Sequence, residues 1–289
     1  MGKYSSFKKE LIQYQKVAIC SHDAGGAEVL SSIVKNYKKK YFFSLSGPAV
    51  NIFKKKIKNI KNYPIKTSIN KSQLLITSTS VKSNIELQAI KYAKKKNKET
   101  ISVLDHWSRY KDRFIIKKSL ILPNTIWTLD PEAMTLSQKL FPKIKIKLVK
   151  NVYLDSIKKI KNIKHKRILF VSDNYDDFYQ KKGVDLLILK KFINYLKKKS
   201  SRNLPIKIYL KPHPSEKKNK YKNLDFNNIE IKIIYKKKLF KLMKNFGTVA
   251  GHQSMALVVG KLFGLKTIGI KTNTEEKEII PKKFIDYYI

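Results

Sequence analysis

The chain has 289 residues, of which 42% are hydrophobic and 11% aromatic, and its formal net charge at pH 7 is +42. This length and apolar content are typical of a globular protein with two domains, and they exclude a disordered chain. The single cysteine, Cys20, excludes an internal disulfide and a cysteine-based zinc site. No apolar run approaches the ~18 residues that span a bilayer, and the polar, lysine-rich N-terminus does not resemble a secretory signal, so we expect a cytoplasmic protein.

The positive charge consists almost entirely of lysine. Lysines form short runs along a chain that is also rich in isoleucine and asparagine. This composition is typical of a protein encoded by an AT-rich genome, so most of the lysines are expected to lie on an ordinary solvated surface. A patch for an anionic membrane or an acidic polysaccharide is the second interpretation, and we expect no nucleic-acid partner. Arginine is more informative, because its planar guanidinium group can bind a carboxylate or phosphate with two hydrogen bonds, which lysine cannot do. Only four of the 63 basic residues are arginine: Arg109, Arg113, Arg167 and Arg202.

Short apolar runs alternate with segments of helical periodicity along the whole chain, which is typical of parallel strands joined by helices. In the first half we expect strands at residues 16–20, 41–45, 74–77, 100–104, 125–129 and 144–149 and helices at 27–37, 84–96 and 131–141. Pro131 suits the first turn of its helix, with Asp130 as the N-cap.

After a charged segment at residues 156–166 the pattern starts again. We expect strands at 167–172, 206–210, 229–235, 248–250 and 266–270 and helices at 184–199, 238–245 and 254–263. The sequence therefore predicts an α/β protein with two Rossmann-like domains facing across a cleft. The predicted domains are residues 1–155 and 156–289, and the C-terminal tail is allowed to return to the first domain.

Histidines concentrate at the predicted strand ends. His165 lies in the charged linker, but the other four stand within three residues of the end of a strand: His22, His106, His213 and His252. Ligands of open α/β sheets bind outside the carboxyl ends of the strands. Any one of these histidines can be structural, but four together predict convergence on a single ligand site.

The first of these motifs is SHDAGG at residues 21–26, directly after the opening strand. Gly25 and Gly26 allow close backbone approach, and the next helix directs its free N–H groups into the crevice. The motif does not match G-x-G-x-x-G, so it is not a dinucleotide fingerprint. Asp23 or His22 is a candidate general base, with a plain tight turn as the alternative. The companion ligands of a metal phosphohydrolase are missing, so we expect no metal.

The second motif, at residues 104–114, contains half of the arginines and one of the two tryptophans. Trp107 can stack on a sugar or base, while Arg109 and Arg113 can pair with a carboxylate or phosphate. The alternative is an amphipathic surface turn with internal Asp–Arg pairs. The predicted sugar- or acceptor-binding residues are Gly25, Gly26, Asp105, His106, Trp107, Arg109 and Arg113.

Two motifs of the second half predict a phosphate site. His213 stands between two prolines, so its ring is held in place before binding, beside Lys211. Further on, a short strand turns through Gly251 into a helix capped near Ser254, whose N–H groups and hydroxyl form a phosphate-sized cradle. The pattern G-x-S-x-G fails there, which argues against a serine hydrolase. The predicted phosphate-binding residues are Lys211, His213, Gly251, His252, Gln253 and Ser254. The acidic cluster at residues 173–177 favours a solvated loop or helix cap over a Mg²⁺ site.

With these two motifs the second half resembles the GT-B glycosyltransferases of bacterial surface-polysaccharide synthesis. It is similar to capsule and polysialic-type transferases, whose His-Pro and serine motifs hold the donor phosphate. The resemblance implies that His213 and Ser254 contact this phosphate. The chain departs from the pattern because the serine motif reads Gln253-Ser254-Met255 and not a Ser-Ser or Ser-Thr pair, and because the first half lacks a clear acidic-acidic-glycine motif. The chain is also similar in outline to the UDP-GlcNAc 2-epimerase group.

The leading hypothesis from the sequence is metal-independent and cofactor-independent transfer of a sugar from a nucleotide sugar to a surface-glycan or lipid-linked acceptor. Asp23 or His22 would take the proton of the acceptor hydroxyl, and preorganised donors would stabilise the leaving phosphate. Such an enzyme is expected in the cytoplasm, with peripheral contact to the inner face of the cell membrane. The alternatives are a nucleotide-sugar epimerase or hydrolase of the 2-epimerase type, which needs no acceptor, and a non-enzymatic basic binding protein.

Overall fold

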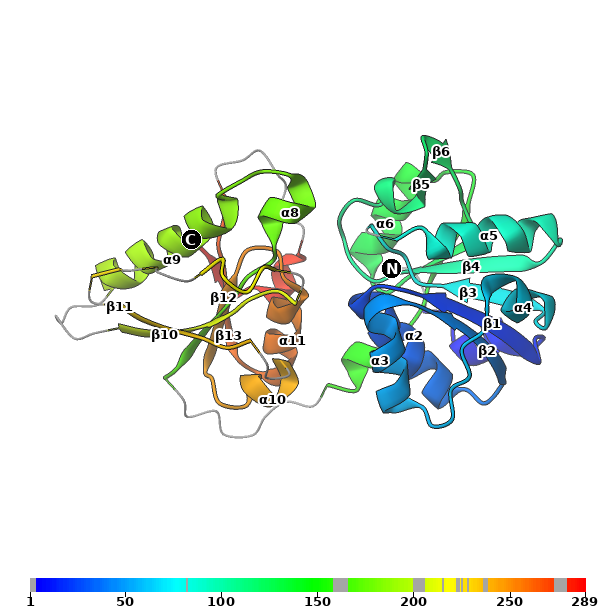
Figure 1. The fold of residues 1–289 in the computed structure, drawn as a ribbon, viewed down its shortest axis with the longest axis horizontal. Coiled ribbons are helices and arrows are strands. Elements are labelled where there is room, and N and C mark those ends of the chain that lie inside the picture. The colour runs from blue at the N-terminus through cyan, green and yellow to red at the C-terminus, as the bar shows by residue number, and fades with distance from the viewer. Residues whose placement is uncertain are drawn as a thin grey trace. The chain divides into compact units, whose positions relative to one another are not determined.

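The chain consists of two α/β units, Met1–Ser156 and Ile157–Ile289 (Figure 1). Each unit contains one parallel six-stranded sheet, so the predicted fold class with two Rossmann-like domains is confirmed. His165 and most of the charged linker lie outside the described residues. The computed structural model describes residues 4–81, 83–157, 166–199, 206–214, 216–221, 224, 226–227, 229–235, 239–272 and 280–289.

The sheet of unit 1 has the strand order β2-β1-β3-β4-β7-β8. The order reverses between β1 and β3, so the loops that follow these two strands flank the switch point where α/β sheets bind ligands. All four residues of β3 and of β7 are buried, as in a parallel sheet covered on both faces. The strands are β1 (Lys16–Ser21), β2 (Lys40–Leu45), β3 (Leu74–Thr77), β4 (Glu99–Leu104), β7 (Thr125–Thr128) and β8 (Lys145–Leu148).

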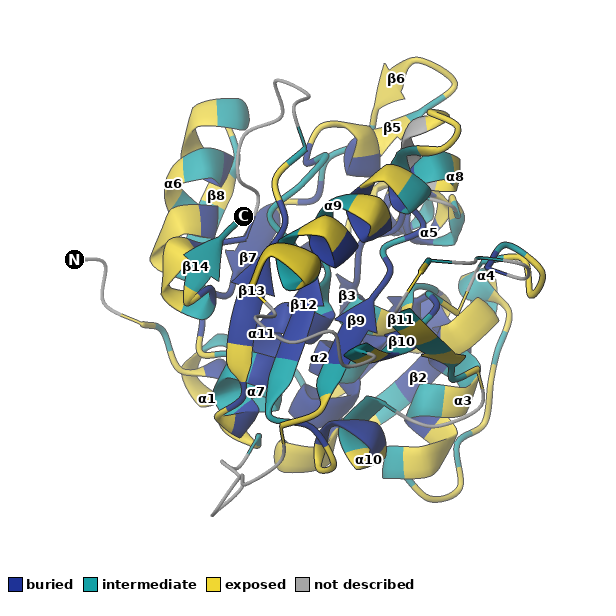
Figure 2. Cartoon of the chain, turned by 90° about the vertical axis from the view of Figure 1, so that its left-hand side faces the viewer, coloured by how far each residue is buried: buried dark blue, intermediate teal, exposed yellow. Residues whose placement is uncertain are grey.

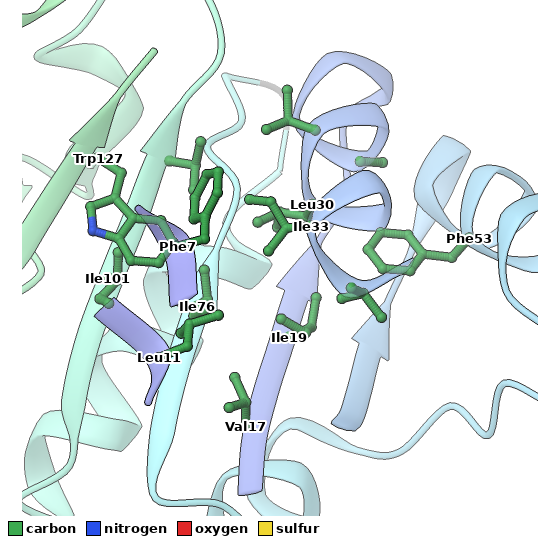
Figure 3. Packing of buried hydrophobic residues seen from close by; sticks show 14 of the residues in the cluster. Phe7, Leu11, Val17, Ile19, Leu30, Ile33, Phe53, Ile76, Ile101 and Trp127 are labelled. Atoms are coloured by element: carbon green, nitrogen blue, oxygen red, sulfur yellow. The ribbon is translucent and has the colours of Figure 1, made fainter. Parts of the chain in front are cut away.

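Helices pack their apolar sides on this sheet. In the core, the ring of Phe7 meets the ring of Trp127 edge-on at 5.1 Å between centroids, and Leu30 and Ile33 lie over Ile19 (Figure 3). The helices are α1 (Phe7–Leu11), α2 (Ala24–Asn36), α3 (Gly47–Lys56), α4 (Ile65–Asn70), α5 (Ile85–Lys95), α6 (Pro131–Leu140) and α7 (Val152–Asp155), with a 3-10 turn at Asp112–Phe114 and a hairpin of β5 (Ile115–Ile116) and β6 (Ser119–Leu120).

The helix α2 begins three residues before its predicted start at residue 27. Asp23 adopts the extended conformation of an N-cap, and the helix begins at Ala24. Gly25 and Gly26 therefore lie in its first turn and not in a loop. The helices α1, α4 and α7 and the hairpin were not predicted, because short elements show no measurable periodicity. The ten-residue helix α3 was not predicted either. The predicted cap of α6 is confirmed, since Asp130 Oδ1 accepts a hydrogen bond of 2.8 Å from the backbone N–H of Ala133.

The sheet of unit 2 has the order β11-β10-β9-β12-β13-β14, which places its switch point between β9 and β12. The central strands β9, β12 and β13 are mostly buried, whereas β11 has no buried residue, and the outer face of α9 is exposed (Figure 2). The strands are β9 (Ile168–Val171), β10 (Ile206–Lys211), β11 (Ile229–Ile233), β12 (Thr248–Gly251), β13 (Lys266–Gly269) and β14 (Tyr287–Tyr288). The helices are α8 (Tyr175–Tyr179), α9 (Val184–Lys199), α10 (Leu239–Met243) and α11 (Met255–Phe263), with a 3-10 turn at Lys282–Phe284.

The end of the C-terminal tail belongs to unit 2. The sequence had left open that this tail returns to the first domain. β14 pairs in parallel with β13, and the backbone N–H of Ile289 donates to the carbonyl of Gly269 at 2.9 Å. The unsatisfied edge of β13 explains this position, because its backbone groups need partners. Residues 273–279 of the tail lie outside the described ranges. None of the helices in the described part of the chain is long and apolar enough to cross a membrane.

Candidate functional site

The switch point of unit 1 is organised around Glu86, in the first turn of α5. Its side chain is buried, and Oε1 accepts hydrogen bonds from the backbone N–H of His22 at 2.9 Å and from Ser78 Oγ at 3.0 Å. Ser78 Oγ is in turn 2.8 Å from Ser21 Oγ. Glu86 therefore ties the loop after β1 to the loop after β3.

Glu86 is also a group that can hold a proton near neutral pH. Burial raises its pKa to about 7 against the lowering effect of the hydrogen bonds from Ser78 and His22, and the charge of Asp23 raises it further. Among the described residues its Oε2 has no hydrogen-bond partner. Glu86 is not recognisable as a site residue from the sequence, because an acidic residue in a first helical turn is ordinary. Only the fold shows that this one is buried.

His22 and Asp23 form a pair at the N-terminus of α2. His22 Nδ1 lies 2.6 Å from Asp23 Oδ1, and both side chains are partly exposed. The Asp23 carboxylate makes no cap bond to the helix. Gly47, with φ +51°, lies against the His22 ring, where a Cβ atom would overlap Nε2. A carboxylate that orients a partly exposed imidazole is an arrangement suited to general-base chemistry.

Asp105 follows β4 and lies against the first turn of α2. A Cβ atom on Gly25 would overlap Asp105 Oδ2, and one on Gly26 would overlap the side chain of Ser78. The two glycines therefore allow close approach of Asp105 and Ser78 to the helix, while their predicted role in binding a sugar or acceptor stays a prediction. The side chain of Asp105 is 9% exposed, and burial raises its pKa while Arg113 lowers it and Asp23 raises it.

The arginines of the 104–114 motif have carboxylate partners within unit 1. Arg109 Nε donates to Asp112 Oδ2 at 2.8 Å, and Arg113 Nη1 lies 3.8 Å from Asp105 Oδ1. The internal Asp–Arg pairs that the sequence left open are thus present. Arg113 is buried, and it also donates to the carbonyl of Ser108 at 3.0 Å, so it fixes the loop that carries Asp105.

Two further residues of this motif are held by polar neighbours. Trp107 Nε1 donates to Asp130 Oδ2 at 2.7 Å, which links the loops after β4 and β7. His106 Nδ1 lies 2.9 Å from Ser108 Oγ. Burial raises the pKa of Asp130 to about 6. The role of Trp107 and His106 in binding a sugar stays a prediction.

In unit 2 the predicted phosphate cradle holds a carboxylate of the chain itself. Asp173 Oδ2 accepts a hydrogen bond of 2.5 Å from the backbone N–H of Gln253, and the Ser254 side chain also hydrogen-bonds to Asp173. Ser254 caps α11 by accepting from the N–H of Ala256 at 3.3 Å. Burial raises the pKa of Asp173 to about 7. These donors are thus preorganised toward an anionic oxygen, although the present occupant is Asp173.

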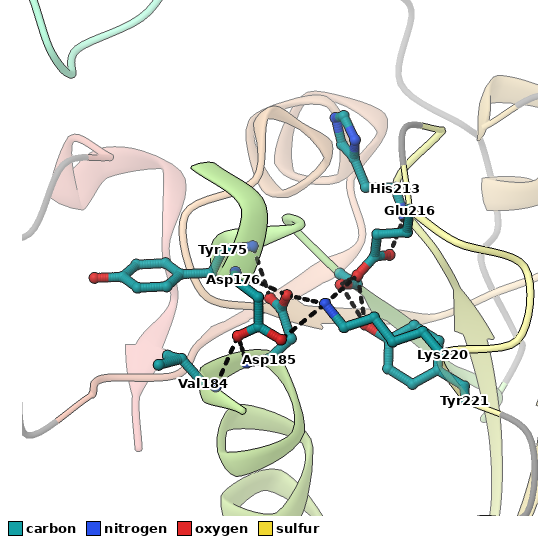
Figure 4. A network of polar contacts seen from close by, with 9 residues as sticks. Tyr175, Asp176, Val184, Asp185, His213, Glu216, Lys220 and Tyr221 are labelled. Carbon is teal, nitrogen blue, oxygen red and sulfur yellow. Dashed lines mark hydrogen bonds and ion pairs between the residues drawn. The ribbon is translucent and has the colours of Figure 1, made fainter. Parts of the chain in front are cut away.

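The loop of His213 is anchored by a second buried glutamate (Figure 4). Glu216 Oε2 accepts from the backbone N–H of His213 at 2.7 Å, and Oε1 accepts from Ser172 Oγ at 2.8 Å and from the Tyr221 hydroxyl at 2.7 Å. Because Ser172 precedes Asp173, this network connects the His213 loop to the predicted phosphate cradle. The imidazole of His213 points away from the network (Figure 4).

Lys220 contributes a positive charge to this network. Its ammonium group lies 3.1 Å from a carboxylate oxygen of Glu216 and of Asp176, and it also pairs with Asp185. Asp176 additionally accepts from the backbone N–H of Val184 at the start of α9, as expected of a helix cap. Across the described ranges, no group of three or more His, Cys, Asp or Glu side chains is placed to hold a metal ion.

Lys211 and His252, both predicted to bind phosphate, have internal contacts. Lys211 Nζ donates to the carbonyl of Tyr235 at 2.9 Å, and burial lowers the pKa of this lysine. His252 Nδ1 lies 2.6 Å from the carbonyl oxygen of Ile270, and its ring packs against Tyr175. Within each unit the loops that carry the histidines meet at the sheet edge. Convergence of all four histidines on one site stays a prediction.

No protein-family model and no curated protein matches this chain. Among solved structures the chain is similar to UDP-GlcNAc 2-epimerases. For the enzyme of Methanocaldococcus jannaschii the TM-score is 0.58 at 16% identity, covering 90% of this chain and 85% of the other. For that of Neisseria meningitidis bound to UDP-GlcNAc it is 0.60 at 12% identity, covering 90% and 84%. A Staphylococcus aureus MnaA–UDP structure gives 0.59 at 12% identity, covering 89% and 80%. These likenesses establish the fold.

Proposed function

We propose that this chain is an enzyme that acts on a nucleotide sugar, and that it converts the sugar without an acceptor, as an epimerase or hydrolase. The observation that carries this proposal is the gathering of Asp23, Glu86 and Asp105 at one edge of the unit 1 sheet, where the charge of Asp23 acts on both other carboxyls. The likeness to UDP-GlcNAc 2-epimerases over 90% of the chain supports it. The glycosyl transfer that leads the sequence analysis becomes the second candidate.

The chemistry of epimerisation explains why several carboxyls are useful. Inversion at a ring carbon breaks one C–H bond and forms another on the opposite face, so a base must take a proton and an acid must return one. Carboxyls that lie in different environments can divide these roles. The buried Asp105, with its raised pKa, suits the proton donor, and Asp23 with His22 suits the acceptor.

In the proposal, unit 2 binds the diphosphate of the nucleotide. The backbone N–H of Gln253 and the hydroxyl of Ser254 would donate to phosphate oxygens at the positive end of α11, where Asp173 now accepts. His213 and Lys211 stand on the neighbouring loop and strand end and would add positive or hydrogen-bonding groups. Asp173 would accept a proton or move away when phosphate binds.

The test is incubation with UDP-GlcNAc and with CMP-, GDP- and CDP-linked sugars in D₂O without any acceptor, followed by NMR. Incorporation of deuterium at an inverted carbon indicates an epimerase, and release of free nucleotide indicates a hydrolase. We expect Asp105→Asn to lower turnover by about 10²-fold or more while nucleotide binding persists. Asp112→Asn is the matched control, because Asp112 lies on the same loop but its side chain is 50% exposed. Absence of turnover for every sugar would refute the proposal.

Glycosyl transfer remains the second candidate because of the His22–Asp23 pair. An imidazole 2.6 Å from a carboxylate and partly exposed can take the proton of an acceptor hydroxyl. Turnover that begins only when a surface-glycan or lipid-linked acceptor is added would favour this candidate, and His22→Ala would then lower the rate.

A further inference from the structure

The hairpin of β5 and β6 exposes an apolar pair. Ile115 and Leu120 lie directly opposite each other in its antiparallel register, and the residues are 40% and 52% exposed. The hairpin protrudes from unit 1, and β6 is exposed along its length (Figures 1 and 2). Cross-strand apolar pairs ordinarily pack against a core. Within the described part of the chain, this pair is only partly covered, and its remaining apolar surface faces solvent.

The turn of this hairpin carries lysine where lysine is unfavourable. Lys117 and Lys118 have φ angles of 46° and 66°, so both central residues are left-handed. Two-residue hairpin turns of this kind favour asparagine and glycine. Elsewhere in the described part of the chain, the left-handed residues other than glycine are three asparagines, one arginine and one glutamine, and no two of them are adjacent: Asn59, Asn97, Arg109, Asn174 and Gln180. Two consecutive lysines at the tip are therefore costly to the fold, which points to a use for their ammonium groups.

We propose that this hairpin, residues 115–120, docks unit 1 onto an anionic lipid bilayer. Ile115 and Leu120 would insert between the headgroups, and Lys117 and Lys118 would bind lipid phosphates while their methylene stems stay in the apolar layer. Stable attachment to a membrane surface needs two signals, such as an apolar anchor and basic charge, and the hairpin presents both. This inference does not depend on the proposed function.

A bilayer fits this surface better than a protein partner does. Two exposed side chains and a turn cover far less than the ~800 Å² that each partner buries in a stable protein interface. A bilayer needs no matching shape, and its anionic headgroups complement a chain with a net charge of +42. The lysine content of the sequence suggests an anionic membrane by charge alone, and the hairpin adds an apolar anchor.

The experiment is co-sedimentation of the full chain with vesicles of phosphatidylcholine containing one part in three phosphatidylglycerol. We expect Ile115→Ser/Leu120→Ser to weaken binding about tenfold. The matched control is Ile12→Ser/Leu187→Ser, which removes two apolar residues that are 64% and 58% exposed elsewhere. The control should bind like the parent chain. Vesicles of phosphatidylcholine alone should bind little of any variant.

A second pair of variants separates the tip lysines from charge in general. Lys117→Asn/Lys118→Gly suits the turn better, so we expect a higher Tm together with vesicle binding weakened severalfold. Lys94→Gln/Lys95→Gln removes the same charge from the C-terminal end of α5, shortly before β4 begins at Glu99. This variant should leave vesicle binding nearly unchanged.

Three outcomes would overturn the proposal. The first is a parent chain that does not bind the anionic vesicles. The second is equal loss in the hairpin variants and in their controls, which would assign binding to the lysine-rich surface as a whole. The third is a parent dimer that dissociates when Ile115 and Leu120 are replaced, measured by light scattering, since a second copy would then be the occupant.

Discussion

The backbone N–H of His22 donates a hydrogen bond of 2.9 Å to the buried carboxyl of Glu86. Unit 2 contains the same relationship, because the N–H of His213 donates to Glu216 at 2.7 Å. Each glutamate also accepts from a serine hydroxyl that follows a strand at the switch point, Ser78 and Ser172 respectively. In both units a buried glutamate therefore positions the loop of a strand-end histidine.

The two glutamates differ in whether a cation lies beside the buried carboxyl. Glu216 lies beside the ammonium group of Lys220, whereas Oε2 of Glu86 has no hydrogen-bond partner among the described residues. Burial without a cation raises the pKa of Glu86 to about 7. The two loops should consequently respond differently to pH and to mutation.

We expect the stability of unit 1 to fall as pH rises. In the folded chain Glu86 keeps its proton up to a pKa of about 7, while its ordinary value is 4.5. The folded state thus binds more protons than the unfolded state between these values, so the free energy of unfolding decreases across this range, by about 3 kcal/mol in all. Glu86→Gln keeps an acceptor for His22 but has no charge to bury, and it should abolish this decrease.

The measurement is urea unfolding at pH 4.5 and pH 8, followed by tryptophan fluorescence. Both tryptophans, Trp107 and Trp127, lie in unit 1, so the signal reports this unit. Comparison of the parent chain with Glu86→Gln isolates Glu86 from other carboxyls. An equal pH dependence in both proteins would contradict the assignment.

Replacement of Lys220 should destabilise unit 2. Lys220→Met would leave Glu216, Asp185 and Asp176 together without their cation, and loss of one partner of a buried ion pair costs about 3–5 kcal/mol. Hydrogen exchange of the β10 amides measures this loss. The exposed Lys217→Met serves as control and should change little. A loss below 1 kcal/mol would show that solvent screens the cluster.

The occupant of the predicted phosphate cradle should control nucleotide binding. With a pKa of about 7, Asp173 is mostly neutral at pH 6 and mostly charged at pH 8, where its charge repels phosphate. We expect the affinity for UDP-GlcNAc to fall about tenfold over this range. Asp173→Asn should bind more tightly at pH 8 and flatten the profile, measured by titration calorimetry. Asp177→Asn, an exposed member of the same acidic cluster, should keep the parent profile.

Gly25→Ala should separate activity from stability. The new Cβ atom displaces the Asp105 carboxyl, and a misplacement of about 1 Å can cost 10²-fold in rate. The fold should lose little, within about 1 kcal/mol, because alanine favours the first turn of α2 and the displaced atom is the end of a side chain. The exposed Ala24→Ser provides the control. Unchanged turnover in Gly25→Ala would remove Asp105 from the proposed acid–base set.

The sequence by itself determined the α/β class and the position of most strands, because apolar runs between helical segments require a covered parallel sheet. It also indicated that His22, Asp105, His213 and Ser254 follow strands. These are local properties of pattern and position. They needed no knowledge of what packs against them.

Only the tertiary structure decided which polar groups are buried and which residues they contact. It places Glu86 and Glu216 beneath the histidine loops, brings Asp105 against Gly25, and seats Asp173 on the helix end predicted for phosphate. Burial raises the pKa values of Glu86, Asp105 and Asp173. Residues separated by 64 or 80 positions, such as His22 and Glu86 or Asp173 and Gln253, meet only when the strands pair, so no local pattern could reveal them.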